Sequence, residues 1–365
     1  MFSTIPIHKT LGYINIFSSS ISLFFNGFLI YLILAKSPKE FGVYKYLLAF
    51  ISVFELFYSV LEIVLVPFEG SFRIIQIHYT VRAYSVVMVN LSDKRFSRFS
   101  IRVLNSIYWA FFGSSLAIFA LQFIYRYLTI SMSKLIKTFY SWKIIFWLMV
   151  PFFNGIVWAL MGMLLCSPTQ EATEILRPFV LRDFKMDIDN FDYLGGPLYT
   201  KSENGTIQPY FKTLFTISTM SVVVVSSFTF SFAVILYCGT KCYLAISELN
   251  DITTSSAKSQ SIQSQLFYAL VIQTLIPTLL LHFPVSIMFG FVFADNGLGI
   301  YSSIVSITIS LYPAIDPLPN FFIITPYRKA VFRCINKNYQ LSDNHAPPNS
   351  KNAVAPAPGA PIPAI

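Results

Sequence analysis

The chain has 365 residues, of which 55% are hydrophobic and 12% charged, and 37 of them are phenylalanine. A water-soluble fold with this composition would have too little polar material to cover its surface, so we exclude a soluble protein. The net charge of +9 does not indicate a nucleic-acid partner, because the Lys and Arg residues lie in short flanks between apolar runs.

Seven apolar segments are long enough to cross a bilayer as helices, which takes about 20 residues each because only a helix or closed barrel satisfies the backbone in lipid. In chain order they cover residues 12–35, 46–68, 103–125, 144–166, 213–240, 266–294 and 298–324. The sequence therefore predicts an all-α membrane protein, a bundle of seven transmembrane helices. We expect the first segment to be retained as a span and not cleaved as a signal peptide.

Basic residues beside the first span set the orientation. Lys9 precedes this span, whereas Lys36, Lys39 and Lys45 follow it, so the positive-inside rule places the N-terminus (residues 1–11) outside. With seven spans the C-terminus is then cytoplasmic. The basic residues support this only narrowly, since 14 of the 26 Lys and Arg fall on the inner side and six lie in the first outer loop.

The two long outer loops cover residues 69–102 and 167–212. Each contains one glycosylation tripeptide, beginning at Asn90 and Asn204, which is consistent with an outer location. The first loop also has a run rich in β-branched and aromatic residues at 72–81, which favours a short hairpin that caps the bundle.

Three acids lie inside predicted spans, Glu55 and Glu62 in the second and Asp316 in the seventh. An ionisable group at this depth is costly unless it is paired, protonated or facing a cavity. Glu55 and Glu62 are seven residues apart and so share a helix face. We expect them to make polar contacts inside the bundle that couple the second and seventh spans; a protonated carboxyl with one neighbour and no switching role is the alternative.

After the seventh span, residues 326–340 form a basic amphipathic stretch suited to lying on the inner membrane surface, where lipid would be its partner. Cys334 in this stretch is a palmitoylation candidate, with a plain cytoplasmic thiol as the alternative. Residues 341–365 contain repeated Ala-Pro and no large apolar face, so we expect a disordered cytoplasmic tail.

Several stretches together resemble the nematode serpentine chemoreceptors of the Str class, with the related Srj class fitting nearly as well. The strongest is Gln265–Phe289 with its two prolines, and the others are residues 42–67, 123–130, 174–199, 235–243 and 316–328. The resemblance implies a rhodopsin-like G-protein-coupled receptor architecture and an olfactory-type receptor for a small external chemical. It also implies a heterotrimeric G protein as partner and a plasma-membrane location in sensory-neuron cilia.

The resemblance also suggests the residues of activation and G-protein coupling, namely Tyr125, Arg126, Tyr127, Pro277, Pro284, Asp316 and Pro317. The rhodopsin-like pattern has an acid before the arginine, and this chain has Tyr125 there instead. Arg126 is either an activation contact or an ordinary cytoplasmic flank residue. The two prolines each remove a helix hydrogen bond, which makes a hinge or a static kink.

A small ligand that enters from outside would meet His282, between the two prolines, although a buried histidine is more often an interhelical hydrogen-bonding residue. Four aromatic residues are expected to line the same pocket: Trp109, Phe112, Phe283 and Tyr301. An apolar, aromatic interior favours a small, weakly polar ligand.

A transporter or channel is the alternative from a different class, but the chain has no evident repeats and few charges inside its spans. A retinal protein would need a lysine in the seventh span, and residues 298–324 contain none. The four cysteines, at positions 166, 238, 242 and 334, show no metal spacing with the histidines. Since catalytic motifs are also lacking, we expect no metal, cofactor or enzymatic activity.

Overall fold

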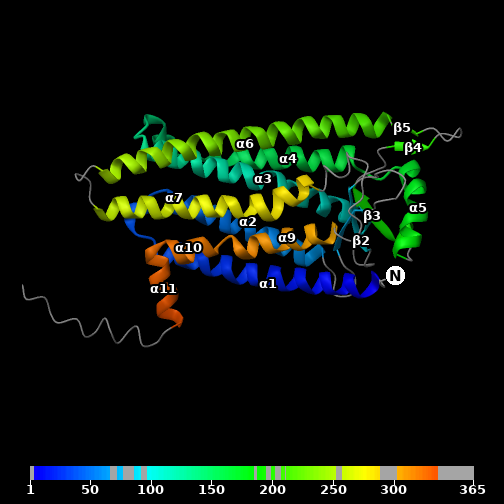
Figure 1. Cartoon of the computed structure of the whole chain (residues 1–365), viewed down its shortest axis with the longest axis horizontal. Coiled ribbons are helices and arrows are strands. Elements are labelled where there is room, and N and C mark those ends of the chain that lie inside the picture. Colours follow the sequence, from blue (N-terminus) through cyan, green and yellow to red (C-terminus); the bar gives the residue numbers. More distant parts are fainter. Residues whose placement is uncertain are drawn as a thin grey trace, which may run out of the picture.

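The computed structural model describes residues 4–65, 72–76, 86–91, 97–184, 187–194, 199–201, 207–209, 211–251, 257–287 and 302–335. Long helices run side by side in it, with strands gathered at one end of the bundle and α11 turned away at the other (Figure 1). The predicted all-α membrane bundle is confirmed.

The first four spans are single helices: α1 Thr4–Lys36, α2 Tyr44–Leu65, α3 Arg98–Ile130 and α4 Ile144–Leu165. Their connections include short 3-10 turns, η1 Lys39–Phe41 and η2 Lys134–Thr138. Helix α3 begins before the predicted boundary at 103, because Ser97 caps it by accepting a 3.1 Å hydrogen bond from the Ser100 backbone N–H. This extra turn brings Arg98 and Arg102 into the helix.

The fifth span belongs to α6, Phe211–Asp251, which continues past the predicted end at residue 240. The sixth consists of α7, Ala257–Pro277, then a π-helical turn, η4 Thr278–His282, and a final helical stretch at 283–287. The predicted residues 288–294 lie outside the described part of the chain.

The seventh span is broken into α9, Ser302–Ile315, and α10, Leu318–Ile323, at Asp316 and Pro317. The chain then bends by 101° into α11, Thr325–Ile335. Among the described residues, six helices are long and apolar enough to cross a membrane. The bent pair of Ile307–Ile323 and Thr325–Cys334 supplies a seventh span when it is counted as one. Helix α11 overlaps the amphipathic stretch expected at 326–340, beginning one residue earlier.

The outer end carries a three-stranded antiparallel sheet, ordered β1 (Phe72–Gln76), β2 (Val86–Leu91) and β3 (Phe191–Leu194). The first outer loop therefore forms a hairpin, but its second strand lies beyond the predicted run at 72–81. The second outer loop contributes β3, the helix α5 (Gln170–Phe184), the 3-10 turn η3 (Ile188–Asn190) and a separate hairpin of β4 (Tyr199–Lys201) and β5 (Ile207–Pro209). The sequence did not predict α5, nor the pairing of β2 with β3 that joins the two outer loops.

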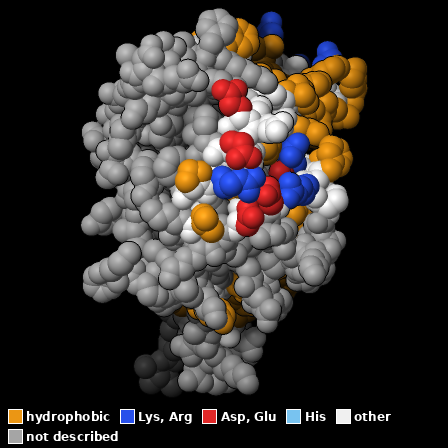
Figure 2. Space-filling model, turned by 90° about the vertical axis from the view of Figure 1, so that its right-hand side faces the viewer, with side chains coloured by type: hydrophobic (Ala, Val, Ile, Leu, Met, Phe, Trp, Pro, Cys, Tyr) orange, Lys and Arg blue, Asp and Glu red, His pale blue; other side chains and the backbone are white. Residues whose placement is uncertain are grey.

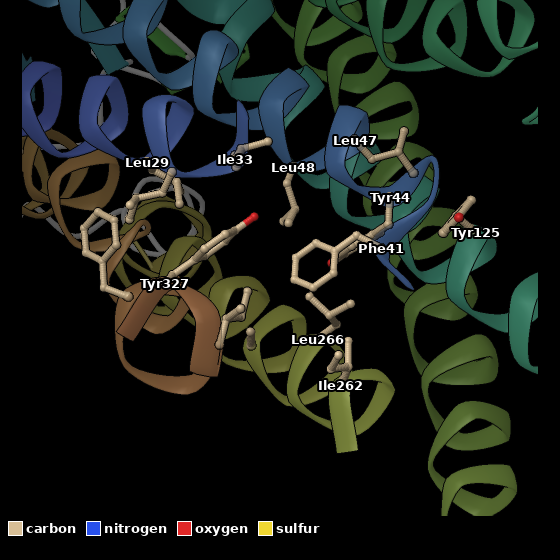
Figure 3. Close-up of a cluster of buried hydrophobic side chains, with 14 of the residues drawn as sticks. Leu29, Ile33, Phe41, Tyr44, Leu47, Leu48, Tyr125, Ile262, Leu266 and Tyr327 are labelled. Carbon is tan, nitrogen blue, oxygen red and sulfur yellow. The ribbon is translucent and has the colours of Figure 1, made fainter. Parts of the chain in front are cut away.

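The inner end is held by a cluster of buried apolar side chains from several helices (Figure 3). Leu29 and Ile33 come from α1, Leu47 and Leu48 from α2, and Leu266 from α7. Helix α11 joins this cluster through Tyr327, whose hydroxyl is 2.6 Å from Ser37 Oγ. The backbone N–H of Thr325 donates to Gln265 Oε1 at 2.8 Å, so α11 is bound to both α1 and α7.

Candidate functional site

The inner end of α3 carries a buried cation. Arg126 is 1% exposed, and its Nη1 donates a 2.6 Å hydrogen bond to Gln263 Oε1 of α7. The guanidinium also lies 3.6 Å from the centroid of the Tyr44 ring of α2. Arg126 therefore joins three helices, and its role in activation stays a prediction.

The two tyrosines beside Arg126 face different neighbours. Tyr125 is buried, stacks on Tyr44 with ring centroids 5.8 Å apart and meets Phe139 edge-on at 5.2 Å. Tyr127 contacts Tyr237 of α6 at 5.9 Å. The missing acidic neighbour of the arginine is thus replaced by an aromatic ring from α2 and an amide from α7, which hold the cation without a carboxylate.

A polar group at mid-depth connects the second and seventh spans through Glu55, as the sequence suggested, whereas the hydrogen bonds of Glu62 are with Ser19 of α1 and Tyr108 of α3. Tyr312 of α9 donates its hydroxyl to Glu55 Oε1 of α2 at 3.3 Å. Asp316 faces α7, where Gln273 Nε2 donates to its Oδ2 at 3.0 Å. Pro317 begins α10 as its N-cap residue. Whether these groups switch during activation stays a prediction.

Helix α1 takes part through an amide that sequence analysis did not single out. Asn26 Nδ2 donates to the carbonyl oxygen of Pro313 at 3.0 Å, and Ser22 Oγ donates to the same oxygen at 2.9 Å. Ser59 of α2 donates in turn to Ser22 Oγ at 2.6 Å. Pro313 is 287 positions from Asn26 and 291 from Ser22, so local sequence carries no signal for their contact.

The two prolines of the sixth span bracket a π-helical turn. Pro277 ends α7, η4 follows at once, and Pro284 lies in the helical stretch after it. Because neither proline has an N–H, two carbonyl groups of the preceding turn lose their helical donors. Wide turns of this kind are often found at functional sites and bends.

His282, the last residue of η4, lies in an aromatic group formed by four helices. Its ring is 5.0 Å from Phe112 of α3 and 4.9 Å from Phe228 of α6. Trp158 of α4 packs 5.2 Å from Phe112 and 5.9 Å from Phe228. We call these four residues, His282, Phe112, Phe228 and Trp158, the aromatic group.

Ser115 of α3 lies beside His282. Its Oγ is 2.8 Å from the Phe112 carbonyl oxygen, to which it donates, and 3.2 Å from His282 Nε2, where the imidazole tautomer decides which atom donates. His282 Nδ1 is buried and has no partner among the described residues. Trp158 Nε1–H is a buried donor without a partner there.

The other predicted pocket residues are not in this group. Trp109 packs toward Gly162 of α4, where a methyl group added to the glycine would lie 3.3 Å from the indole. Phe283 is 57% exposed and points away from the bundle. Tyr301 lies outside the described residues. Trp158, Phe228 and Ser115 were missed, because ordinary apolar and small residues of a span carry no distinguishing pattern.

A polar bridge supports the aromatic group. Asn154 of α4 donates through Nδ2 to the Gly113 carbonyl oxygen of α3 at 2.6 Å, and its Oδ1 accepts from Ser227 Oγ of α6 at 3.0 Å. Gly113 and Gly155 allow α3 and α4 to approach closely, since a Cβ on Gly113 would lie 2.3 Å from the Trp158 indole. This close packing fixes the position of Trp158.

The outer cap is fastened to α3 by an ion pair. Arg102 Nη2 lies 2.9 Å from Asp192 Oδ1 of β3, and the Asp192 side chain is 3% exposed. A more exposed cluster surrounds Arg177, which contacts Asp187, Asp189 and Glu174 at 2.8 to 3.2 Å. The Arg177 guanidinium holds the pKa of Asp189 below its usual value. Figure 2 shows this end of the molecule, with acidic and basic side chains gathered in one patch.

The two predicted modification sites at the outer end stay predictions. Asn90 lies in β2, the central strand of the three-stranded sheet, and Asn204 falls outside the described residues. At the inner end, Cys334 is exposed on α11, as modification by a lipid would require.

Comparison with known proteins gives consistent matches. Residues 11–332 match the family described as serpentine type 7TM GPCR chemoreceptor Str. G-protein coupled receptor str-217 of Caenorhabditis elegans is 34% identical over 328 residues, covering 90% of this chain and 89% of the relative. Serpentine receptor class r-10 of the same organism is 30% identical, with 84% and 86% covered.

Among solved structures, squid rhodopsin superposes with a TM-score of 0.57 at 12% identity. The match covers 96% of this chain and 93% of squid rhodopsin. At this identity the likeness concerns the fold alone. It supports the rhodopsin-like arrangement of the helices.

Proposed function

Because this chain belongs to the Str family of serpentine seven-transmembrane chemoreceptors, we propose that its aromatic group binds the ligand and that Arg126 controls access of the G protein. The chain is a G-protein-coupled chemosensory receptor that binds a small external chemical and activates a heterotrimeric G protein. The family is one of receptors, so a transporter or channel is not favoured.

The observation that supports the proposal is that one helix, α7 with its continuation η4, contributes both the hydrogen-bond partner of Arg126 and a member of the aromatic group. Gln263, the hydrogen-bond partner of Arg126, lies near the inner end. His282, within the aromatic group, lies toward the outer end, and Pro277 and η4 stand between the two. A ligand that shifts His282 therefore acts on the helix that holds the buried cation.

The aromatic group specifies the chemistry of the ligand. Its surface consists mainly of aromatic rings, so burial of apolar area supplies most of the binding energy. His282 Nδ1 offers one polar ring nitrogen and Trp158 Nε1 offers one donor, both buried and without a partner among the described residues. A small compound with one or two polar atoms would satisfy these groups and orient itself against Phe112 and Phe228.

At the inner end, activation would separate α7 from α3. An outward movement of the inner half of α7 about Pro277 would break the Arg126–Gln263 hydrogen bond and open the end of the bundle. The released guanidinium would then face the G protein. The receptor would thus signal when the ligand stabilises the arrangement in which this bond is open.

We also propose that the receptor resides in the plasma membrane of sensory-neuron cilia, with Asn90 and Asn204 as glycosylation acceptors and Cys334 as a palmitoylation site. Exposure of Cys334 on α11, which bends away from the spans, supports the lipid modification. A single acyl chain there would add to the membrane affinity of the helix.

The test is a screen of small odorants against the expressed receptor with a G-protein readout. For an active compound, we expect His282→Phe to raise the half-maximal concentration at least tenfold at equal surface expression. Phe283→Leu is the matched control, since that side chain points outward. Equal potency in the wild type and His282→Phe would contradict the proposed ligand site, and Arg126→Ala that still signals normally would contradict the coupling role.

A further inference from the structure

We propose that the outer part of the bundle contains an ammonium-binding position at Glu62, so that the receptor's ligand is a small organic amine with a short apolar tail. This inference rests on the proposed ligand site, because the tail would lie against the aromatic group. It adds the charge of the ligand, which the aromatic group alone does not specify.

Glu62 is a buried acid near the outer end of α2, only 4% exposed. Ser19 of α1 donates to its Oε2 at 2.8 Å, and Tyr108 of α3 donates to its Oε1 at 3.3 Å. Both oxygens thus accept hydroxyl hydrogen bonds. Among the described residues, ion pairs are made by Arg102 and Arg177 and none by Glu62. A carboxylate buried in this way lacks a compensating charge, which a cationic ligand would supply.

Tyrosine rings stand beside the carboxyl group. The Tyr58 and Tyr108 rings have centroids 5.1 Å apart, and Tyr58 also meets Tyr312 at 6.1 Å and Phe111 at 5.7 Å. The face of such a ring attracts an alkylammonium group, and a carboxylate among aromatic rings is a recurring way to bind one. The composition of this site therefore matches an organic cation better than a neutral ligand.

Buried polar atoms without partners support a missing ligand. The hydroxyl of Tyr58 and both amide atoms of Asn105 have no hydrogen-bond partner among the described residues, and both residues are at most 1% exposed. Asn105 lies one helical turn outward from Tyr108 on α3. Such atoms are rare in folded proteins unless water or a ligand binds them. An ammonium group has three N–H donors, and of these atoms the Tyr58 hydroxyl oxygen and Asn105 Oδ1 can accept them.

The Glu62 position is continuous with the aromatic group. Tyr58, Tyr108 and Leu281 belong to one buried cluster, and Phe112 packs against it. Leu281 directly precedes His282 within η4, and Phe112 lies one turn deeper on α3 than Tyr108. A molecule with its ammonium group at Glu62 can therefore place an apolar tail toward Phe112 and His282.

The test measures binding directly, on the full receptor in lipid nanodiscs, so that it does not depend on a G protein. The probes are matched pairs of equal shape, 2-phenylethylamine with 2-phenylethanol and isoamylamine with isoamyl alcohol. We expect at least one amine to bind tenfold or more tightly than its alcohol. Glu62→Gln should remove this preference, while Glu248→Gln, a change at an exposed acid on α6, should leave it intact.

A second variant covers the case in which Glu62→Gln does not fold. Tyr58→Leu keeps the carboxyl group but removes one ring and its hydroxyl, and should weaken the amine more than the alcohol. Alcohols that bind as tightly as amines, amines that do not bind at all, or a preference that survives Glu62→Gln would each overturn the proposal. Tight amine binding without signalling would instead count against the proposed coupling at Arg126.

Discussion

The guanidinium of Arg126 lies 3.6 Å from the centre of the Tyr44 ring, while its Nη1 donates to Gln263. One cation thus bonds to α2 by a ring face and to α7 by an amide. Two further nitrogens of the same side chain, Nε and Nη2, are buried without a partner among the described residues. Arg126 is therefore held by few contacts among the described residues, and each of them can be removed separately.

Removing the amide should raise signalling without ligand. Gln263→Leu deletes a hydrogen bond to a charged group, worth about 2 kcal/mol, so the open arrangement gains up to roughly thirtyfold in population. A G-protein assay at equal surface expression measures this basal activity. Tyr268→Leu, a change at an exposed residue on the same helix, is the control. Unchanged basal signalling in Gln263→Leu would show that this bond does not restrain the receptor.

The ring can be tested with a matched pair at one position. Tyr44→Phe keeps the aromatic face and loses the hydroxyl with its 3.4 Å hydrogen bond to Gln122, whereas Tyr44→Leu also loses the cation–π contact, worth about 2 kcal/mol when desolvated. We expect basal activity to rise clearly in the leucine variant and little in the phenylalanine variant. If both variants rise equally, the hydroxyl and not the ring restrains Arg126.

Because α3 and α4 pack closely at Gly155, replacing this glycine with alanine should destabilise the protein more than the same replacement at Gly27. In Gly155→Ala the new methyl group would lie 2.3 Å from Ser114 Oγ and 3.1 Å from the Ala110 carbonyl oxygen. Overpacking of this kind costs about 1–3 kcal/mol. Gly27→Ala, with nothing within 4 Å, is the control. Thermal unfolding in detergent should show a lower midpoint for Gly155→Ala alone.

The Arg102–Asp192 ion pair should stabilise the outer end far more than the ion pairs around Arg177. Arg102→Gln leaves Asp192 buried without its charge partner, and breaking a buried pair costs about 3 kcal/mol or more. Arg177→Gln acts on exposed partners, whose pairs contribute little in water. Hydrogen exchange in residues 187–194 should therefore increase far more in Arg102→Gln. Equal exchange in the two variants would mean that β3 is held by its strand pairing alone.

The cluster around Arg177 should also have a defined pH dependence. Because the pKa of Asp189 is lowered in the folded protein, its stabilising contribution is present above the ordinary aspartate pKa of about 3.9 and is lost as the pH falls through the lowered value. Hydrogen exchange of α5 should thus be constant from neutral pH to about 4 after correction for the intrinsic rate. Loosening that begins between pH 7 and 5 would contradict this assignment.

The bundle of membrane-spanning helices was predictable from the sequence, because apolar length is a local property. It could not predict that Arg126 is buried, since the partner Gln263 is 137 positions away and depth alone placed the arginine at a boundary with water. Phe283, by contrast, was expected inside the pocket and is exposed. A position between two prolines looked suitable for a pocket, but the π-helical turn directs His282 inward and Phe283 outward.

The outer cap was harder to predict than the bundle. Helix α5 contains Pro178 and several charges, so its pattern reads as a loop and not as a buried helix. The contact between β2 and β3 joins the two outer loops, and strand pairing between distant segments leaves no local signal. The acids were easier to place, because a charge inside an apolar span has to find a polar neighbour.

The attachment of β3 to α3 distinguishes this receptor from proteins in which a disulfide bond fixes the outer loops. Helix α3 contains no cysteine, and Arg102 with Asp192 joins the two elements by charge. Reducing agents should therefore leave this connection intact. Rising ionic strength should weaken the ion pair, because the Arg102 side chain is partly exposed.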